Sequence, residues 1–179
     1  MSEIRSWGGG EVEHVEGGIS ARTEIIDEYY VCERLIGVEW EPVASIEELL
    51  GSVRAIGMTP SERHGYDPIP LIRAGDKTHT LRGNARVLGT VNQVSVNGTR
   101  IPLWIRWVAR ERVRFGDVCC DEFAIADGIR PVQGSASAAM VRLFESFHGR
   151  KPDPDQQMWL LHFEVFCDLM EELEGTWEM

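Results

Sequence analysis

Cysteine and histidine are the residue types that most often bind metals or act as nucleophile and base. Their spacing in the sequence is therefore the first indication of whether the chain has a metal site or a catalytic site. The chain has four cysteines and five histidines. Cys119 and Cys120 are adjacent, and no cysteines or histidines have a metal-ligand spacing such as Cys-x-x-Cys or His-x-x-x-His. The sequence therefore predicts no metal site, no cofactor and no catalytic residues, and it predicts reduced thiols.

One short motif matches half of a catalytic signature. His162-Phe-Glu164 has the His-x-Glu order of zinc deaminases, in which the histidine binds zinc and the glutamate transfers protons. The second half, Pro-Cys-x-x-Cys, is absent downstream, where Cys167 is the only cysteine. The segment is also predicted to be helical, which would point the two side chains about 200° apart. We interpret the motif as a chance occurrence.

Charge is distributed in three blocks along the chain. Residues 1–50 have 12 acidic and 3 basic side chains, residues 51–115 have 4 and 11, and residues 116–179 have 13 and 4. The net charge of -11 disfavours nucleic-acid binding through general attraction to phosphate. Two interpretations stay open. The acidic ends neutralise the basic middle within the fold, or they bind a basic partner.

The elements that must position any site are mixed α and β. Residues 1–20 contain two glycine runs and predict a flexible acidic arm, followed by a single α+β domain over residues 21–179. Ser45-Ile-Glu-Glu48 has the spacing of a capping box and predicts a helix near residues 46–56. Residues 59–85, rich in proline and glycine, are interpreted as an irregular connection with one short strand at residues 71–73.

Asn97-Gly98 is typical of a two-residue hairpin turn, because both residues tolerate positive φ angles. With this turn, Val94 lies opposite Ile101 and Thr90 lies opposite Ile105. Continued alternation along the second strand predicts one basic face beside an aromatic residue. This face is an alternative site for nucleic acid or anions, formed by Trp104, Arg106, Arg110, Arg112 and Arg114.

The end of the chain predicts two helices that pack against the hairpin. The first follows a serine cap at Ser135 or Ser137 and ends at Gly149, and the second covers about residues 154–174. The second is apolar around most of its circumference, with Trp159, Phe163 and Phe166 left uncovered, which predicts a homodimer. The predicted core includes Trp107, Phe144, Leu161 and Val165.

The acidic side chains near the C-terminus are the predicted partner-binding residues. Acidic groups at the end of a helix oppose its dipole, so a basic partner would give a reason for their position. These residues are Asp168, Glu171, Glu172, Glu174 and Glu178.

The leading hypothesis is a non-enzymatic acidic protein that blocks a basic surface of a partner. By analogy of size and composition, such proteins include anti-CRISPR or anti-restriction inhibitors from phages and immunity proteins that neutralise toxins. A small enzyme without a recognisable motif and a nucleic-acid binder using the Arg106–Arg114 strand are the alternatives. The sequence has neither a signal-peptide pattern nor an apolar stretch of membrane-spanning length, which predicts a cytoplasmic protein.

Overall fold

The computed structural model describes residues 4–14, 21–26, 29–36, 39–45, 53–131 and 133–170, with the backbone alone between residues 21 and 45. The fold is α+β, as predicted, with a mixed sheet packed against a few helices. Within the described residues, no helix is long and apolar enough to cross a membrane.

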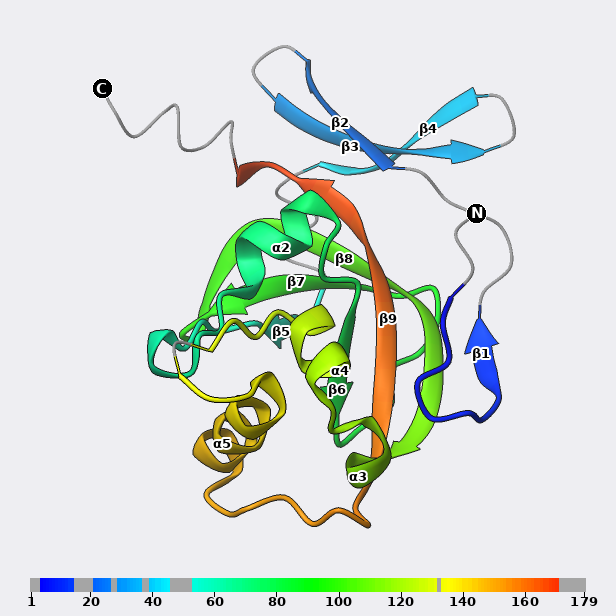
Figure 1. Ribbon diagram of the computed structural model, residues 1–179. Coiled ribbons are helices and arrows are strands. Elements are labelled where there is room, and N and C mark those ends of the chain that lie inside the picture. Colours follow the sequence, from blue (N-terminus) through cyan, green and yellow to red (C-terminus); the bar gives the residue numbers. More distant parts are fainter. Residues whose placement is uncertain are drawn as a thin grey trace.

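A mixed sheet of six strands forms the centre of the molecule (Figure 1). Its order is β5-β7-β8-β9-β6, and β1 pairs with the long strand β8. Only β5 and β7 pair in parallel; the other pairings are antiparallel. The strands are β1 (Val12–His14), β5 (Ala55–Gly57), β6 (His79–Arg82), β7 (Val91–Val96), β8 (Thr99–Arg114) and β9 (Gln157–Asp168).

A second, antiparallel sheet has the order β2-β3-β4, and helices pack on the main sheet. In Figure 1 the second sheet lies at the opposite end of the molecule from α3 and α5. The three strands are β2 (Ala21–Ile26), β3 (Tyr29–Ile36) and β4 (Glu39–Ser45). The helices are the 3-10 turn η1 (Glu62–His64), α2 (Pro68–Ala74), α3 (Phe115–Val118), α4 (Asp121–Ala126) and α5 (Ala136–His148).

The predicted helix before Gly149 is confirmed as α5. Ser135 is its N-cap and accepts a hydrogen bond from the Ala138 amide at 3.2 Å, which satisfies a donor at the first turn. Gly149 ends the helix with φ 73°, a left-handed conformation that glycine adopts without a Cβ penalty.

The Asn97-Gly98 hairpin is confirmed as the connection of β7 to β8, but its predicted register holds only near the turn. Ser95 pairs with Arg100, as a two-residue turn requires. A β-bulge between Gln93 and Ser95 then shifts the pairing, so Ile105 lies opposite Asn92 rather than Thr90. An extra residue in one strand changes every pairing beyond it.

The predicted final helix is wrong, because residues 157–168 form strand β9. This strand pairs with β8 and β6, and its consecutive residues 160–163 are all buried, so both of its faces are covered there. A strand buried on two faces has apolar residues at most positions, and such a run also fits a buried helix. Phe163 and Phe166 are buried within the monomer, and Trp159 is partly buried, so the homodimer stays a prediction.

Two further predictions of local structure change. Residues 71–73, predicted as a strand, belong to α2, which Pro68 begins and Gly75 ends. Of the helix predicted near residues 46–56, residues 46–52 lie outside the described residues, while Ala55–Gly57 form β5. The parallel pairing of β5 with β7 outweighs the local helical pattern at this point.

The core matches most of the prediction. Trp107, Phe144 and Leu161 are buried, and Val165 is partly buried against the same cluster as Trp107. Cys119 and Cys120 are free thiols, but the prediction of reduced thiols is wrong for Cys167, which takes part in a disulfide bond.

The described part of the N-terminal segment, residues 4–14, lies against the sheet. The carboxylate of buried Glu111 accepts hydrogen bonds from the Ser6 hydroxyl at 2.6 Å and from the amides of Trp7 and Gly8 at 3.2 and 2.9 Å. A Cβ on Gly8 would lie 2.8 Å from a Val113 methyl group, so glycine permits this approach. Strand β1 then continues the contact by pairing with β8.

Candidate functional site

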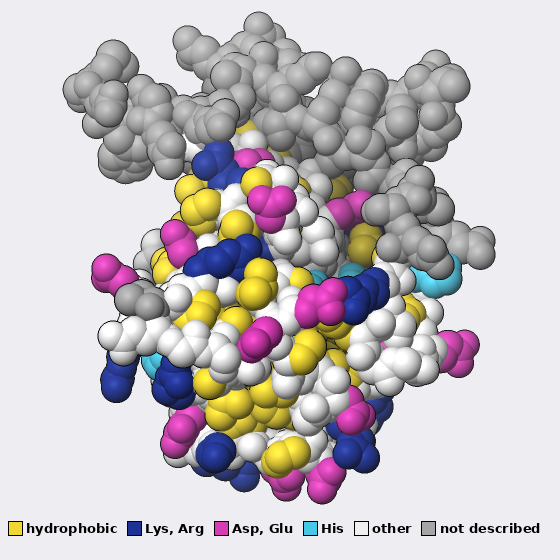
Figure 2. Space-filling model, viewed as in Figure 1, with side chains coloured by type: hydrophobic (Ala, Val, Ile, Leu, Met, Phe, Trp, Pro, Cys, Tyr) yellow, Lys and Arg dark blue, Asp and Glu magenta, His cyan; other side chains and the backbone are white. Residues whose placement is uncertain are grey.

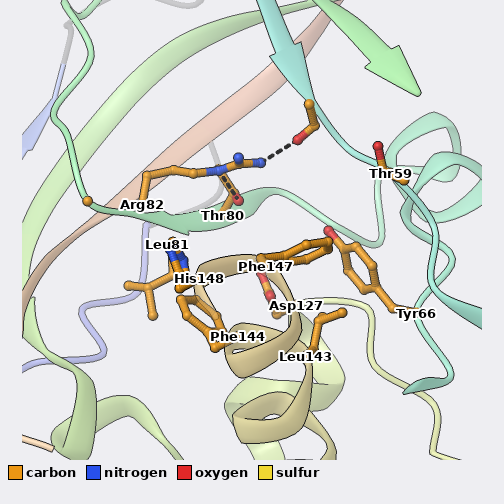
Figure 3. A pocket seen from close by; sticks show the side chains of 12 residues that line it. Thr59, Tyr66, Thr80, Leu81, Arg82, Asp127, Leu143, Phe144, Phe147 and His148 are labelled. Atoms are coloured by element: carbon orange, nitrogen blue, oxygen red, sulfur yellow. Dashed lines mark hydrogen bonds between the residues drawn. The ribbon is translucent and has the colours of Figure 1, made fainter. Parts of the chain in front are cut away.

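A cavity of about 330 Å³ opens between strand β6, the end of β5 and helix α5 (Figure 3). In the close view, Arg82 and Thr80 lie across the cavity from the side chains of α5. Two threonines, an arginine, an aspartate and a tyrosine give it polar groups, and α5 gives it aromatic ones. The lining residues are Gly57, Thr59, Tyr66, Thr80, Leu81, Arg82, Gly83, Asp127, Leu143, Phe144, Phe147 and His148.

A buried ion pair supports the polar side of this cavity. Lys77, which is 1% exposed, follows the Gly75 end of α2, and Asp127 ends α4. The Lys77 Nζ donates to Asp127 Oδ1 at 2.6 Å, to the Asp127 carbonyl at 2.7 Å and to the His79 carbonyl at 2.8 Å. All three ammonium protons are therefore used, which fixes both the charge and the Asp127 carboxylate in place.

Burial shifts both members of the pair in opposite directions. It lowers the pKa of Lys77 and raises the pKa of Asp127, and the attraction between the two charges opposes each shift. The second carboxylate oxygen of Asp127, Oδ2, accepts no hydrogen bond from any described residue. Asp127 thus presents one restrained and one available oxygen, and its raised pKa suits a general base.

Arg82 is held from two sides. Its Nε donates to the Thr80 hydroxyl at 3.1 Å, and its Nη2 donates to the Gly57 carbonyl at 2.6 Å. Burial lowers the pKa of Arg82, which still remains a cation because of its high starting value. Nη1 has no acceptor in the described part of the chain, so the guanidinium retains donors for a ligand.

Thr80 and Tyr66 add two hydroxyl groups. The Thr80 oxygen accepts from the Arg82 guanidinium, so a positive charge lies beside it, and the position of that oxygen is fixed. Burial raises the pKa of Tyr66 well above its usual range, so the phenol stays neutral and can donate a hydrogen bond.

Aromatic groups of α5 form the opposite wall. The rings of Phe144 and His148 are stacked, with centroids 5.6 Å apart and planes 29° apart. Phe147 is 56% exposed, which is high for phenylalanine, and lines the same cavity. A planar ligand can pack against such a wall while its polar groups meet those of β6.

The arginine strand predicted from the sequence does not form one basic face. Trp104 and Arg106 are buried, and Arg106 pairs with Glu164 at 3.1 Å. In the β8–β9 pairing, Trp107 lies opposite Phe163 and Ala109 lies opposite His162, so Val108 is the extra residue of a bulge. This bulge reverses the alternation and separates the face of Arg106 from that of Arg110.

The remaining arginines of β8 have partners in the chain. Arg110 pairs with Glu13 at 2.8 Å, and Arg114 lies 3.6 Å from Asp117 and 3.2 Å from Asp155. Arg112 packs over the Trp159 ring at 5.3 Å. Figure 2 shows acidic and basic side chains interspersed over the described part of the face drawn there. These contacts agree with neutralisation within the fold.

Most of the predicted acidic binding residues lie outside the described residues, namely Glu171, Glu172, Glu174 and Glu178. Asp168 is described, and its carboxylate accepts a hydrogen bond from Arg73 Nε at 2.9 Å. The role of this acidic group in binding a partner therefore stays a prediction.

The His162-Phe-Glu164 motif lies on β9 rather than on a helix, so the two side chains share one face. Glu164 nevertheless pairs with Arg106, and the His162 Nε2 is buried without a hydrogen-bond partner in the described chain. No group of three potential metal ligands occurs among the described histidine, cysteine, aspartate and glutamate residues.

The sequence analysis missed the cavity residues Thr80, Arg82 and Asp127, and it missed Lys77, which pairs with Asp127. They lie in or beyond the segment that was interpreted as an irregular connection. A usable signal was present, because Thr80 and Arg82 alternate with His79 and Leu81 in a short strand pattern. That alternation places a hydroxyl and a guanidinium on one face.

Comparison with known proteins yields a fold likeness. No known protein family matches the sequence, and no curated protein matches it. The structure is similar to the crystal structure of an Enterococcus faecalis V583 protein described as DUF984, with a TM-score of 0.51 and 19% identity over 69% of this chain and 82% of that one. An ASCH domain from Lactobacillus crispatus JV V101 matches with a TM-score of 0.42 and 20% identity, over 55% of this chain and 70% of that one. At this identity, the first likeness shows a shared fold.

Proposed function

We propose that this protein is an enzyme that hydrolyses an amide or ester bond of a small planar molecule. One observation carries the proposal: a hydroxyl, a carboxylate and a guanidinium with free hydrogen-bonding capacity line one small cavity opposite an aromatic wall. This develops the hypothesis of an enzyme without a recognisable sequence motif.

The cavity favours a small planar ligand. Its volume of about 330 Å³ is at the low end of the range of about 300–1,000 Å³ for small-molecule sites. Phe144 and Phe147 provide apolar contact for a ring, and Tyr66 and Thr59 provide hydroxyl groups at its edge. An acylated heterocycle of the size of a nucleobase fits this combination of size, shape and polarity.

Three residues would carry the chemistry. The Thr80 hydroxyl would add to the carbonyl carbon while the Asp127 carboxylate takes its proton, and Arg82 Nη1 would donate a hydrogen bond to the carbonyl oxygen as it gains charge. The leaving amine or alcohol would receive the proton from Asp127. Water would then release the acyl group from Thr80, and Lys77 would keep Asp127 in position throughout.

A substrate screen tests this proposal. The purified chain is incubated with a panel of N-acylated and O-acylated heterocycles, and the released acid is measured by chromatography. We expect turnover of at least one compound, a loss of about 100-fold or more in kcat for Asp127→Asn and Thr80→Val, and little change for Thr78→Val. Thr78 is the matched control, because it is exposed and does not line the cavity.

The proposal fails if no member of the panel is hydrolysed and none binds to the wild-type protein in calorimetry. It also fails if Asp127→Asn, shown to be folded by circular dichroism, retains full activity.

A second proposal retains the hypothesis of an acidic protein that inhibits a basic partner. The acidic blocks at residues 1–50 and 116–179 support it. Reversal of Glu171, Glu172 and Glu174 to lysine should slow association with the partner and weaken its salt dependence without altering hydrolysis, whereas Asp127→Asn should impair hydrolysis alone. A partner captured equally well by the charge-reversed variant argues against it.

A further inference from the structure

A second cavity adjoins the first at the end of α5. Its volume is about 280 Å³, and it is lined by Phe144, His148, Arg150, Pro152 and Gln156. Phe144 and His148 also line the first cavity, so the two spaces meet at this stacked pair. A ligand that packs against the pair can therefore extend from one cavity into the other.

The backbone that carries the second cavity is fixed. Gly149 turns the chain at the end of α5, and hydrogen bonds then join the segment to the beginning of α3. The Phe115 amide donates to the Gln156 carbonyl at 2.9 Å, and the Gly116 amide donates to the Pro154 carbonyl at 2.8 Å. A Cβ on Gly116 would lie 2.9 Å from that carbonyl oxygen, so the close approach requires glycine. Arg150 and Gln156 thus extend from a segment that is anchored before a ligand arrives.

The polar side chains of this cavity have no partners within the described chain. Arg150 makes no ion pair there, and the Gln156 amide makes no side-chain hydrogen bond. Neither of the two carboxylates of the same segment pairs with Arg150. Asp155 lies 3.2 Å from Arg114, and Asp153 accepts a hydrogen bond from the Asp155 amide at 2.9 Å. The cavity therefore offers a cation and neutral donors, and no carboxylate is among its lining residues.

We infer that the second cavity binds a phosphate group of the ligand whose planar ring occupies the first cavity. The substrate class is then a phosphorylated heterocycle, and this assignment rests on the proposed function for the position of the ring. Arginine binds phosphate with two parallel hydrogen bonds, and His148 and Gln156 supply further donors around it.

A different role for the basic groups is equally testable. Cations near the C-terminus of a helix stabilise it by interacting with the helix dipole, and His148 and Arg150 lie at the end of α5. In that role they would affect the stability of α5 and leave ligand affinity unchanged.

Calorimetry with matched ligand pairs distinguishes the two roles. The four ribonucleosides, their 5′-monophosphates and inorganic phosphate are titrated into the wild-type protein and the Arg150→Gln variant. For at least one base we expect the monophosphate to bind about tenfold more tightly than its nucleoside, as one charge-assisted contact would give. Arg150→Gln should remove this advantage and leave nucleoside affinity unchanged. Arg142→Gln, on the exposed face of α5, is the matched control.

Each outcome decides a different claim. Equal affinity of nucleoside and monophosphate in the wild-type protein overturns the phosphate site and leaves the proposed hydrolase intact. If neither the nucleosides nor the monophosphates bind, the proposed position of the ring is wrong. The titration with inorganic phosphate then tests the phosphate site separately. If inorganic phosphate binds to the wild-type protein but not to Arg150→Gln, the result supports the phosphate site. If inorganic phosphate does not bind to the wild-type protein, the result overturns the site. An advantage that persists in Arg150→Gln also overturns it.

Discussion

Strands β8 and β6 both carry arginine side chains, but the two strands differ in whether these side chains remain available to bind a ligand. On β8, Arg106, Arg110 and Arg114 each contact a carboxylate of the same chain. On β6, Arg82 is held by a threonine hydroxyl and a backbone carbonyl, and one of its nitrogens stays available. The strand with more arginines therefore has less capacity to bind an anion.

The comparison shows that the number of cations on a strand does not indicate a binding site. Acidic residues far along the chain, such as Glu13 and Glu164, neutralise β8 once the strands pair. Arg82 avoids this because the nearby carboxylate, Asp127, is already paired with Lys77. A buried ion pair thus leaves its neighbours free to contact a ligand.

Removal of the Lys77 ammonium group should have the largest effect. Lys77→Met leaves the Asp127 carboxylate buried without a partner, so we expect a loss of about 3–5 kcal/mol in the free energy of unfolding. Urea denaturation measures it, with exposed Lys151→Met as control. A loss below about 1 kcal/mol would mean that the pair does not organise this region.

Loss of the buried β8 arginine should have the next largest effect. Arg106→Gln removes the contact to Glu164, which is partly exposed and can be rehydrated. We expect a loss of about 1–3 kcal/mol in the free energy of unfolding and no change in ligand affinity. A drop in ligand affinity with an unchanged free energy of unfolding would assign Arg106 to a binding site. The contrast between the arginines of β8 and Arg82 would then be wrong.

Acidification should lower the free energy of unfolding through His79, which lies beside Lys77. Burial lowers the pKa of His79 to about 2, and the Lys77 charge adds to this effect. An unfolded histidine has a pKa of about 6.5, so stability is full above that pH and is lost as the pH falls below it. His79 should contribute a loss of about 1.4 kcal/mol per pH unit there. Urea denaturation between pH 8 and pH 5 should show a smaller decline for His79→Asn; equal declines would contradict the prediction.

The smallest effect is expected at Arg112, an exposed arginine of β8. Its guanidinium packs over Trp159 and has no carboxylate partner among the described residues. Arg112→Gln should change the free energy of unfolding by less than about 0.5 kcal/mol and leave binding of the monophosphates unaltered. A tenfold loss of monophosphate affinity would move the anion site to β8.

Local signals in the sequence predicted those elements whose ends are marked by particular residues. Asn97-Gly98 predicted the hairpin, and Ser135 and Gly149 predicted α5. Strand β9 was missed because its burial on both faces removes the alternation that distinguishes a strand. The bulges of β7 and β8 were missed because they result from pairing between strands, which local sequence does not specify.

The candidate site was not predicted, for a related reason. Lys77 and Asp127 are 50 residues apart and come together only when α4 packs beside β6. Thr80 and Arg82 are close in sequence, but their role depends on α5 across the cavity. No residue of this group has a type or spacing that is unusual by itself.

Strand β1 also has a consequence for how the chain behaves in a crowded solution. It covers the edge of β8 at residues 109–111, beyond the part that β7 covers. An open strand edge carries unpaired amides and carbonyls that can pair with another chain and start aggregation. Trp7 and the Glu111 contacts hold the segment over this edge. Truncation of the first fourteen residues should therefore reduce solubility at high protein concentration, even where the cavity stays intact.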